Sequence, residues 1–225
     1  MIKIEHVSHS FDNKPILEDI NLEICENEII GIYGKSGIGK STLVKILCGL
    51  IRQNEGDILF QDQLLSSPKS NYNRQLGLQI QMVYQQPFSV LDPCQKIYKG
   101  FEEFVIYHHL CKKKEIKKFI FQIADEVELP RDILNHLPCQ ISGGEAQRIA
   151  IGKCLLLKPK LLILDEATSM LDVSTQANVL GLIRKKVASY NGSILMISHD
   201  ENLLNYYCQK IYEMKDKQIK RKTKK

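Results

Sequence analysis

The sequence predicts an α/β fold with a mainly parallel sheet, an antiparallel β part near the N-terminus and a helical subdomain inserted between two strands. Three observations favour this class. "EIIGIY" (28–33) and "LLIL" (161–164) are short, nearly continuous apolar runs, as in strands buried on both faces. Apolar residues at helical spacing occur in 41–49 and 174–190. A long stretch that reads as helical, from about 94 to 157, separates two of the strands.

Taken in order, the elements begin with "IKIEHV" (2–7), which alternates like an early strand. A second strand, 16–24, follows the turn residues "DNKP". The helix predicted over 41–49 stops at Gly49. Further strands are expected at "DILF" (57–60), "IQMVY" (80–84) and "SILMIS" (193–198). Strands that alternate with helices in this way predict a largely parallel sheet.

Length and composition place limits on the kind of protein. The chain has 225 residues, of which 44% are hydrophobic and 25% charged, as in an ordinary globular protein. We expect one domain over 1–225, with a core of about 1–86 and 158–225 and a helical subdomain of about 87–157. No apolar run approaches the roughly 20 residues of a bilayer-spanning helix, and residues 1–12 lack a signal-peptide core. The seven cysteines form no C-x-x-C pair, which predicts reduced, mostly buried thiols in a cytosol.

Positive charge concentrates near the C-terminus. Residues 210–225 contain eight Lys or Arg and two acidic residues, which give this segment a net charge of +6. Because the whole chain has a formal net charge of +5, residues 1–209 together have a net charge of −1. We expect a frayed, solvated tail there, with attraction to anionic lipid headgroups as the alternative. Without a basic stripe through the body, nucleic acid is not an expected partner. The Lys-rich stretch 112–118 is interpreted as a solvated helix face.

The stretch "GKSGIGKST" matches the phosphate-loop pattern G-x-x-x-x-G-K-[ST]. It lies between a predicted buried strand and a predicted helix, the context in which backbone N–H groups and a helix N-terminus cradle phosphates. Lys40 is expected to reach the β- and γ-phosphates, and the Ser41 hydroxyl to bind Mg²⁺. The nucleotide-binding candidates in this stretch are Gly34, Lys35, Ser36, Gly37, Ile38, Gly39, Lys40, Ser41 and Thr42.

Two adjacent carboxylates, Asp165 and Glu166, follow the predicted strand 161–164 at its C-terminal end, where open α/β sheets bind ligands. We expect Asp165 to hold Mg²⁺ through water and Glu166 to polarise the attacking water as a general base. An acidic turn that caps the next element is the alternative. Nothing in the sequence indicates a kinase acceptor site, and no Asn-Lys-x-Asp guanine-binding motif is present.

With these motifs, the chain resembles the nucleotide-binding subunit of an ABC transporter over essentially its full length. Further motifs that carry the resemblance are "MVYQQP" (82–87), "ISGGE" (141–145), "SMLD" (169–172) and "ISHD" (197–200). The resemblance implies that Phe11 stacks on adenine and that Gln85 senses the γ-phosphate and joins the Mg²⁺ ligands. It also implies that Asp172 contributes to the nucleotide site and that His199 contacts the γ-phosphate.

The "ISGGE" stretch predicts a second phosphate-binding loop. Ser142 with Glu145 three residues later is a capping-box pattern, and Gly143 and Gly144 remove side chains that would block an anion. Read alone, the pattern is equally that of an ordinary well-capped helix. The resemblance implies that this loop binds the ATP held by a partner, so that two subunits dock head to tail with each ATP between them.

The branch of the family is indicated by "IQMVYQQPFSVLDP" and "LDEATSMLDVSTQANVLGLI", which look most like ATPases of peptide and nickel importers. "IGKCL" (151–155) departs from the usual "IARAL", with Gly152 and Lys153 as unusual residues. The resemblance implies ATP hydrolysis that drives a separate transmembrane permease, with a second ABC ATPase subunit and, indirectly, an extracytoplasmic solute-binding protein. The location implied is peripheral, on the cytoplasmic face of the membrane. The alternative is a soluble ABC-type ATPase that acts on ribosomes or DNA.

Many large apolar residues follow Gln85. They either form the core of the helical subdomain or line an exposed groove that receives a short helix of the permease. The residues in question are Phe88, Val90, Leu91, Tyr98, Phe101, Phe104 and Tyr107.

Overall fold

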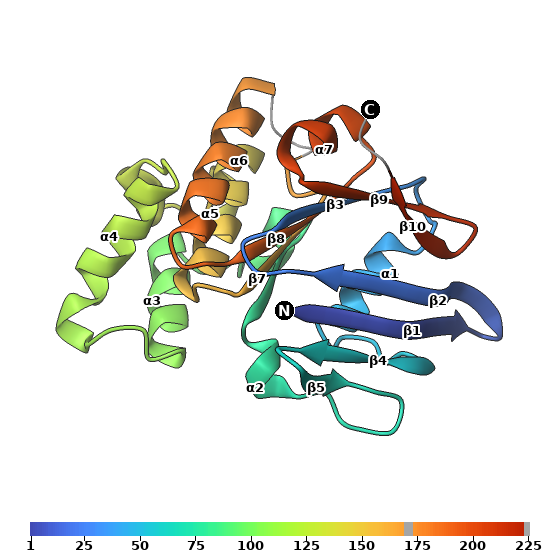
Figure 1. The fold of residues 1–225 in the computed structure, drawn as a ribbon. Helices are drawn as coiled ribbons and strands as arrows, with labels where there is room; N and C mark the ends of the chain where they lie inside the picture. Colours follow the sequence, from blue (N-terminus) through green and yellow to red (C-terminus); the bar gives the residue numbers. More distant parts are fainter. Residues whose placement is uncertain (169–172, 223–225) are drawn as a thin grey trace. The chain divides into compact units, whose positions relative to one another are not determined.

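Two β-sheets organise the N-terminal and C-terminal parts of the chain (Figure 1). The computed structural model describes residues 1–168 and 173–222. The first sheet is antiparallel, in the order β2-β1-β4-β5, and the second has the order β10-β9-β3-β8-β7-β6. Their strands are β1 (Ile2–Phe11), β2 (Lys14–Ile24), β3 (Ile29–Tyr33), β4 (Glu55–Phe60), β5 (Gln63–Ser66), β6 (Ile80–Val83), β7 (Leu161–Asp165), β8 (Ser193–Ser198), β9 (Lys210–Lys215) and β10 (Gln218–Lys222).

The antiparallel sheet begins with a tight hairpin. Asp12 and Asn13 connect β1 to β2, with φ of 48° and 62°, and Phe11 pairs with Lys14 across the turn. Asp and Asn tolerate this left-handed conformation, which matches the twist of a two-residue hairpin. The hairpin carries Phe11 at its tip.

The second sheet is parallel at its centre. β3 pairs in parallel with β8 and with β9, and β7 pairs in parallel with β8. Since β3, β7 and β8 run in one direction, their carboxyl ends share one edge. Buried side chains of both sheets and of α1 (Lys40–Leu47) form one hydrophobic cluster, which includes Phe60, Leu43 and Leu195. The predicted α/β class with a mainly parallel sheet and an N-terminal antiparallel part is confirmed.

The described chain divides into two compact units. The first consists of Met1–Met82, Pro159–Glu166 and Val187–Lys225, and the second of Val83–Lys158 and Ala167–Lys186. The remaining helices are α2 (Arg74–Gly77), α3 (Ile97–Tyr107), α4 (Ile116–Glu126), α5 (Gly143–Leu156), α6 (Val173–Ala188) and α7 (Glu201–Tyr207).

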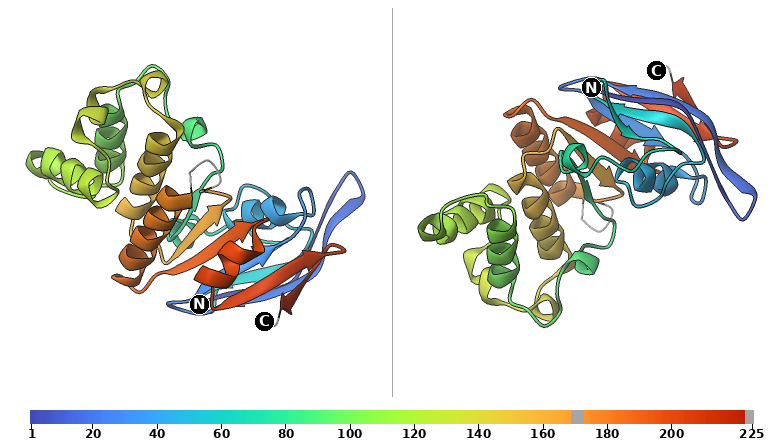
Figure 2. Two further views of the ribbon diagram at one scale, coloured as in Figure 1. Left: turned by 90° about the horizontal axis from the view of Figure 1, so that it is seen from above. Right: turned by 90° about the horizontal axis from the view of Figure 1, so that it is seen from below.

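Helices α3, α4 and α5 pack together in the second unit, as the views of Figure 2 show. Helix α3 buries Ile97, Phe101 and Val105, and α4 buries Ile116, Ile120, Ile123 and Ala124. These residues recur every three or four positions, which is the spacing of one helix face. The outward face of α4 carries lysines.

Two expectations from the sequence are wrong. Residues 210–222 are not a frayed tail, because they form the β9–β10 hairpin with ion pairs from Lys210 to Glu28, Lys217 to Glu18 and Lys222 to Glu201. The thiols are free, as expected, but not mostly buried: Cys25, Cys94 and Cys139 are exposed, whereas only Cys154 and Cys208 are buried. Cys25 and Cys94 lie in connections between elements, and Cys139 lies in the short 3₁₀ helix Pro138–Gln140.

Among residues 1–168 and 173–222, no helix has the length and the apolar character that a membrane crossing requires.

Candidate functional site

The phosphate loop joins β3 to α1. Gly37 and Gly39 have φ of 76° and 112°, a conformation that L side chains rarely adopt. A Cβ on Gly39 would lie 2.9 Å from Leu17 Cδ2, and a Cβ on Gly34 would lie 2.7 Å from the carbonyl oxygen of Met214. The loop therefore needs glycine at these positions for its own geometry.

Lys40 points back under this loop. Its Nζ donates hydrogen bonds to the carbonyl oxygens of Gly34 at 2.7 Å and Lys35 at 2.9 Å, and the residue is only 6% exposed. Burial lowers the pKa of Lys40, and the nearby carboxylates of Glu166 and Asp165 offset part of that shift. The ammonium group is thus desolvated and oriented in advance, as a phosphate-binding lysine requires.

Ser41 and Asp165 come from different elements and meet in the same site. The Ser41 hydroxyl lies near enough to the Asp165 carboxylate to affect its pKa. Burial raises the pKa of Asp165, the neighbouring Ser41 hydroxyl lowers it, and the carboxylate of Glu166 raises it. Hydroxyl and carboxylate oxygens are the donors that Mg²⁺ prefers, so the pair fits this ion together with substrate phosphates and water. In the described part of the chain, no cluster of three or more His, Cys, Asp or Glu could hold a metal unaided.

Glu166 follows directly, in a strained backbone conformation. Its φ is 49°, in the left-handed region that a glutamate seldom adopts, and its N–H donates to the carbonyl oxygen of Ile197 at 3.0 Å. His199 follows the neighbouring strand β8, and its Nδ1 lies 3.5 Å from Oε1 of Glu166. The sequence separates these two side chains by more than thirty residues, and the parallel register brings them together.

Phe11, at the tip of the β1–β2 hairpin, is 45% exposed. The ring of His9 contacts its ring edge-on, with 4.5 Å between the centroids. His9 is buried, and neither ring nitrogen has a hydrogen-bond partner. His9 was not among the residues predicted from the sequence, although its position two residues before Phe11 on one strand face could have revealed the contact.

Helix α5 begins with the predicted capping box. The Ser142 Oγ accepts from the Glu145 N–H at 3.3 Å, and Oε2 of Glu145 accepts from the Ser142 N–H at 2.7 Å. A Cβ on Gly143 would meet no atom within 4 Å. The start of the helix therefore has its cap in place and open space at Gly143, as an anion-binding end requires.

Two candidates remain, Gln85 and Asp172. Gln85 is exposed and belongs to the second unit, whereas Lys40, Ser41, Asp165, Glu166 and His199 belong to the first. Asp172, with the rest of "SMLD" (169–172), lies outside the described residues.

The apolar residues after Gln85 divide into two groups. Phe101 is fully buried and Leu91 is 9% exposed, so these two are core residues. Phe88, Val90 and Tyr107 are exposed by 43%, 38% and 79%. Tyr98 and Phe104 are half-buried.

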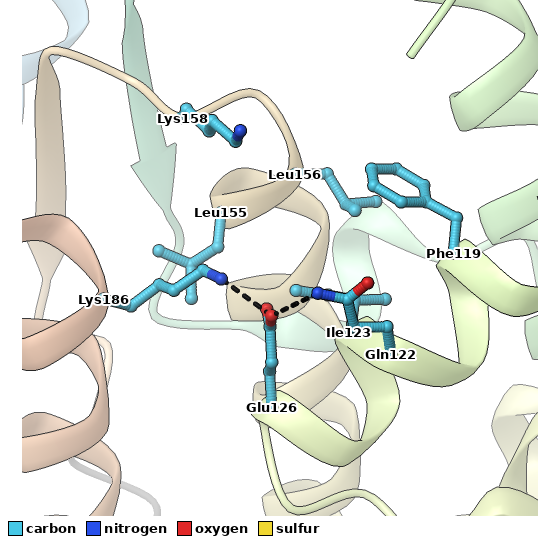
Figure 3. A pocket seen from close by; sticks show the side chains of 8 residues that line it. All are labelled: Phe119, Gln122, Ile123, Glu126, Leu155, Leu156, Lys158 and Lys186. Atoms are coloured by element: carbon cyan, nitrogen blue, oxygen red, sulfur yellow. Dashed lines mark hydrogen bonds and ion pairs between the residues drawn. The ribbon is translucent and has the colours of Figure 1, made fainter. Parts of the chain in front are cut away.

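The second unit also contains a small cavity of about 120 Å³ (Figure 3). Two of its charged groups form an ion pair, since Glu126 accepts from Lys186 at 2.8 Å, and Glu126 also accepts from Gln122 at 3.0 Å. Half of its eight lining side chains are apolar, namely Phe119, Ile123, Leu155 and Leu156. None of the candidate residues from the sequence lines this cavity.

The unusual pair Gly152 and Lys153 lies in α5. A Cβ on Gly152 would meet Ile123 and Phe101 side-chain atoms at 3.5 Å, an ordinary contact distance. Nζ of Lys153 lies 5.9 Å from the centroid of the Phe101 ring, and burial lowers the pKa of Lys153. No steric clash therefore requires glycine at position 152.

Comparisons with known proteins agree on one family. The family model described as "ABC transporter" matches residues 17–169. The nickel import ATP-binding protein NikE of Escherichia coli (strain K12) is 30% identical over 228 residues, which cover 97% of this chain and 85% of that protein. The NikE protein of Shigella dysenteriae serotype 1 shows the same identity and coverage.

Two solved structures agree with this result. The ATP-binding cassette MJ0796, described as a dimer in a post-hydrolysis state bound to ADP and Pi, has a TM-score of 0.86 at 26% identity and covers 100% of this chain and 98% of that one. CbiO1 from Clostridium perfringens, part of the ABC transporter complex cbiONQ, has a TM-score of 0.83 at 25% identity, covering 97% and 86%. With the phosphate loop, the carboxylate pair and the capped glycine-rich helix, these matches show that the chain belongs to the ABC transporter family, as an ATP-binding ATPase subunit.

Proposed function

We propose that this ATPase dimerises on ATP and drives a separate membrane permease that imports nickel, related metal complexes or peptides. The observation that carries the proposal is the arrangement around Lys40. The buried ammonium group of Lys40 donates to two carbonyl oxygens of the phosphate loop, and the Ser41 hydroxyl lies near the Asp165 carboxylate. The names of the NikE relatives support nickel import as the transport step.

In this proposal the phosphate loop, from Gly34 to Thr42, binds the ATP phosphates through its backbone N–H groups, and Phe11 stacks on adenine. Ser41 and Asp165, with Gln85 as the predicted third ligand, would hold Mg²⁺, which would neutralise charge on the phosphate oxygens. Glu166 orients and deprotonates the attacking water. His199, 3.5 Å from Glu166, contacts the γ-phosphate and holds that carboxylate in position.

The proposed dimer follows from the capped end of α5. Ser142, Gly143 and Gly144 bind the γ-phosphate of ATP held by the other subunit, and Asp172 contributes to the same composite site. The open space at Gly143 supports this assignment. So does the description of MJ0796 as a dimer. Whether the second subunit is identical or homologous, its phosphate loop would face this helix start.

The proposed location is peripheral, on the cytoplasmic face of the membrane, where the permease holds the ATPase pair. An extracytoplasmic solute-binding protein takes part indirectly, by delivering cargo to the permease. CbiO1, described as part of a transporter complex, supports a complex of this kind. Within the single domain over 1–225, we assign nucleotide binding to about 1–86 and 158–225 and coupling to the helical subdomain of about 87–157.

The test is a comparison of the wild-type chain with Lys40→Ala, co-expressed with its candidate permease. We expect wild-type to co-purify with a polytopic membrane protein and to support ATP-dependent uptake of Ni²⁺ or a peptide. Lys40→Ala should assemble equally well but lose ATP binding and uptake. Co-purification with ribosomes or DNA instead would contradict the transport proposal and favour the soluble ATPase alternative.

A further inference from the structure

The connection between α3 and α4 and the start of α4 carry a local excess of positive charge. Residues 112–118 contain five lysines and a single acidic residue, Glu115, and all of these side chains are exposed. Among the described residues, none of the five forms an ion pair, whereas Lys99 and Lys186 in the same unit bind Glu102 and Glu126. The five are Lys112, Lys113, Lys114, Lys117 and Lys118.

Local structure keeps these lysines turned outward. Lys113 and Lys114 lie in a short 3₁₀ turn, Lys113–Glu115, which leads into α4. Lys117 and Lys118 follow in the first turn of α4, beside Ile116, which is buried. Because the buried positions of α4 are fixed by the core, its lysines cannot turn inward.

Exposed apolar side chains lie just before the lysines, at the C-terminal end of α3. Tyr107 is 79% exposed and Ile106 is 50% exposed. The ring of His108 contacts the rings of Phe104 and Tyr107, with centroid distances of 4.5 Å and 4.9 Å. Large apolar groups exposed next to a charge cluster usually mark a contact surface.

We propose that Ile106, Tyr107 and these five lysines form a surface, here called the α3–α4 surface, that binds an anionic lipid bilayer directly. The lysines match the negative potential of anionic headgroups, and the two apolar side chains match the interface between headgroups and acyl chains. This goes beyond the proposed function, in which the permease alone holds the subunit at the membrane.

Lipid fits this surface better than nucleic acid. No arginine occurs between Arg74 and Arg131, so the surface lacks the planar, bidentate donor that dominates base and phosphate recognition. Its most exposed aliphatic group, Ile106, has no stacking face for a nucleobase but suits the edge of a bilayer.

The test measures co-sedimentation of the purified full chain with vesicles, without ATP or permease. We expect binding to vesicles of phosphatidylcholine and phosphatidylglycerol in equal parts, little binding to phosphatidylcholine alone, and weakening with salt. The triple variant Lys112→Gln, Lys113→Gln, Lys114→Gln should lower the apparent lipid affinity about tenfold or more, since each lysine contributes to the attraction.

The matched control is Lys215→Gln, Lys220→Gln, Arg221→Gln in the β9–β10 hairpin, which removes the same charge from a place without large exposed apolar groups. It should bind vesicles nearly as the wild-type does. Equal loss in both variants would show that net charge alone matters and would overturn the assignment. Undetectable wild-type binding, or binding of an RNA oligonucleotide in preference to vesicles, would do the same.

The apolar contribution is tested separately with Ile106→Ser, Tyr107→Ser. We expect this variant to lose the binding that survives at high salt and to keep most of the binding at low salt. Unchanged binding at high salt would reject insertion of these side chains. All variants change exposed residues, so thermal unfolding and ATP binding should match wild-type. A failure of the proposed transport function would leave these vesicle measurements unaffected.

Discussion

Nδ1 of His199 and Oε1 of Glu166 lie 3.5 Å apart at the ends of β8 and β7. In the parallel register Asp165 pairs with Ile197, which places the residues that follow each strand side by side. The proposed general base and the proposed γ-phosphate contact are therefore positioned by one pair of strands, and changes at the two residues should be coupled.

The first prediction is a double-mutant cycle. Glu166→Gln should retain ATP binding but lose roughly 10²–10⁴-fold in turnover, because the amide cannot accept the proton of water. It should also accumulate as an ATP-bound dimer. His199→Ala should slow turnover as well, and the double variant should be little slower than Glu166→Gln, since residues that act as a unit are not additive.

Steady-state ATPase assays and size-exclusion chromatography with ATP provide these measurements. Near-wild-type hydrolysis by Glu166→Gln would remove Glu166 from the role of base. Fully multiplicative losses in the double variant would mean that the two side chains act independently, despite their proximity.

The second prediction concerns Ser142. Ser142→Arg places a bulky cation at the start of α5, so ATP should still bind to the monomer through Lys40 and Ser41 while dimerisation and cooperative hydrolysis fail. Ser142→Ala is the matched control for the cap: it should cost about 1 kcal/mol of helix stability without blocking an approaching phosphate. Equilibrium ATP binding and analytical ultracentrifugation measure the two effects. A loss of monomer affinity in Ser142→Arg would contradict the two-chain site.

The third prediction separates core from surface after Gln85. Phe101 is fully buried, so Phe101→Lys should cost several kcal/mol and unfold the helical unit. Phe88 is 43% exposed, so Phe88→Lys should leave folding and ATP binding intact. If Phe88 lines a groove for the permease, the same variant should lose assembly and transport, as measured by co-purification and uptake. Normal assembly and transport by Phe88→Lys would show that Phe88 does not contact the permease.

The fourth prediction is a pH dependence due to His9. Burial lowers the pKa of His9 from its ordinary value of 6.5. The unfolded chain therefore binds the proton more readily, so the free energy of unfolding should fall as pH drops below about 6.5. His9→Phe should flatten this dependence, whereas His109→Gln, at an exposed site, should not. Urea unfolding at pH 7.5 and 5.5 compares the variants, and an unchanged slope in His9→Phe would exclude His9 as the source.

The fifth prediction concerns Gly152. The 3.5 Å distances that an added Cβ would have to Ile123 and Phe101 allow Gly152→Ala without displacement. Alanine loses less conformational entropy in a helix, so the variant should be more stable by up to about 1 kcal/mol. Thermal unfolding measures this, with Gly39→Ala as the contrasting change that should destabilise the phosphate loop. Destabilisation by Gly152→Ala would show that α5 needs glycine for another reason.

The parts of the fold that follow from local sequence were predictable. β3 and β7 were recognised because strands buried on both faces are continuously apolar, and the capping box at Ser142 and Glu145 depends on residues three positions apart. The β9–β10 hairpin was missed because its few apolar residues, such as Ile211, Met214 and Ile219, are interspersed among many charged ones without regular alternation. Its ion pairs to Glu18, Glu28 and Glu201 join distant segments, which no local pattern reveals.

In the candidate site, too, the sequence predicts what depends on local pattern but not what depends on tertiary packing. Residue types and spacing identified Lys40, Ser41, Asp165 and Glu166, because phosphate and Mg²⁺ chemistry restricts the choice. The approach of the Ser41 hydroxyl to the Asp165 carboxylate depends on tertiary packing between α1 and β7, so the sequence alone could not give it. The roles of Gln85 and Asp172 stay predictions.

The two hydrogen bonds from Lys40 to the carbonyl oxygens of Gly34 and Lys35 hold the side chain against its own loop. An ammonium group has three N–H donors, so one donor is left for a phosphate oxygen while two stay bonded to the backbone. Nucleotide binding therefore need not break these bonds. The lysine occupies the same place before and after a phosphate binds, so binding costs little side-chain entropy at this residue.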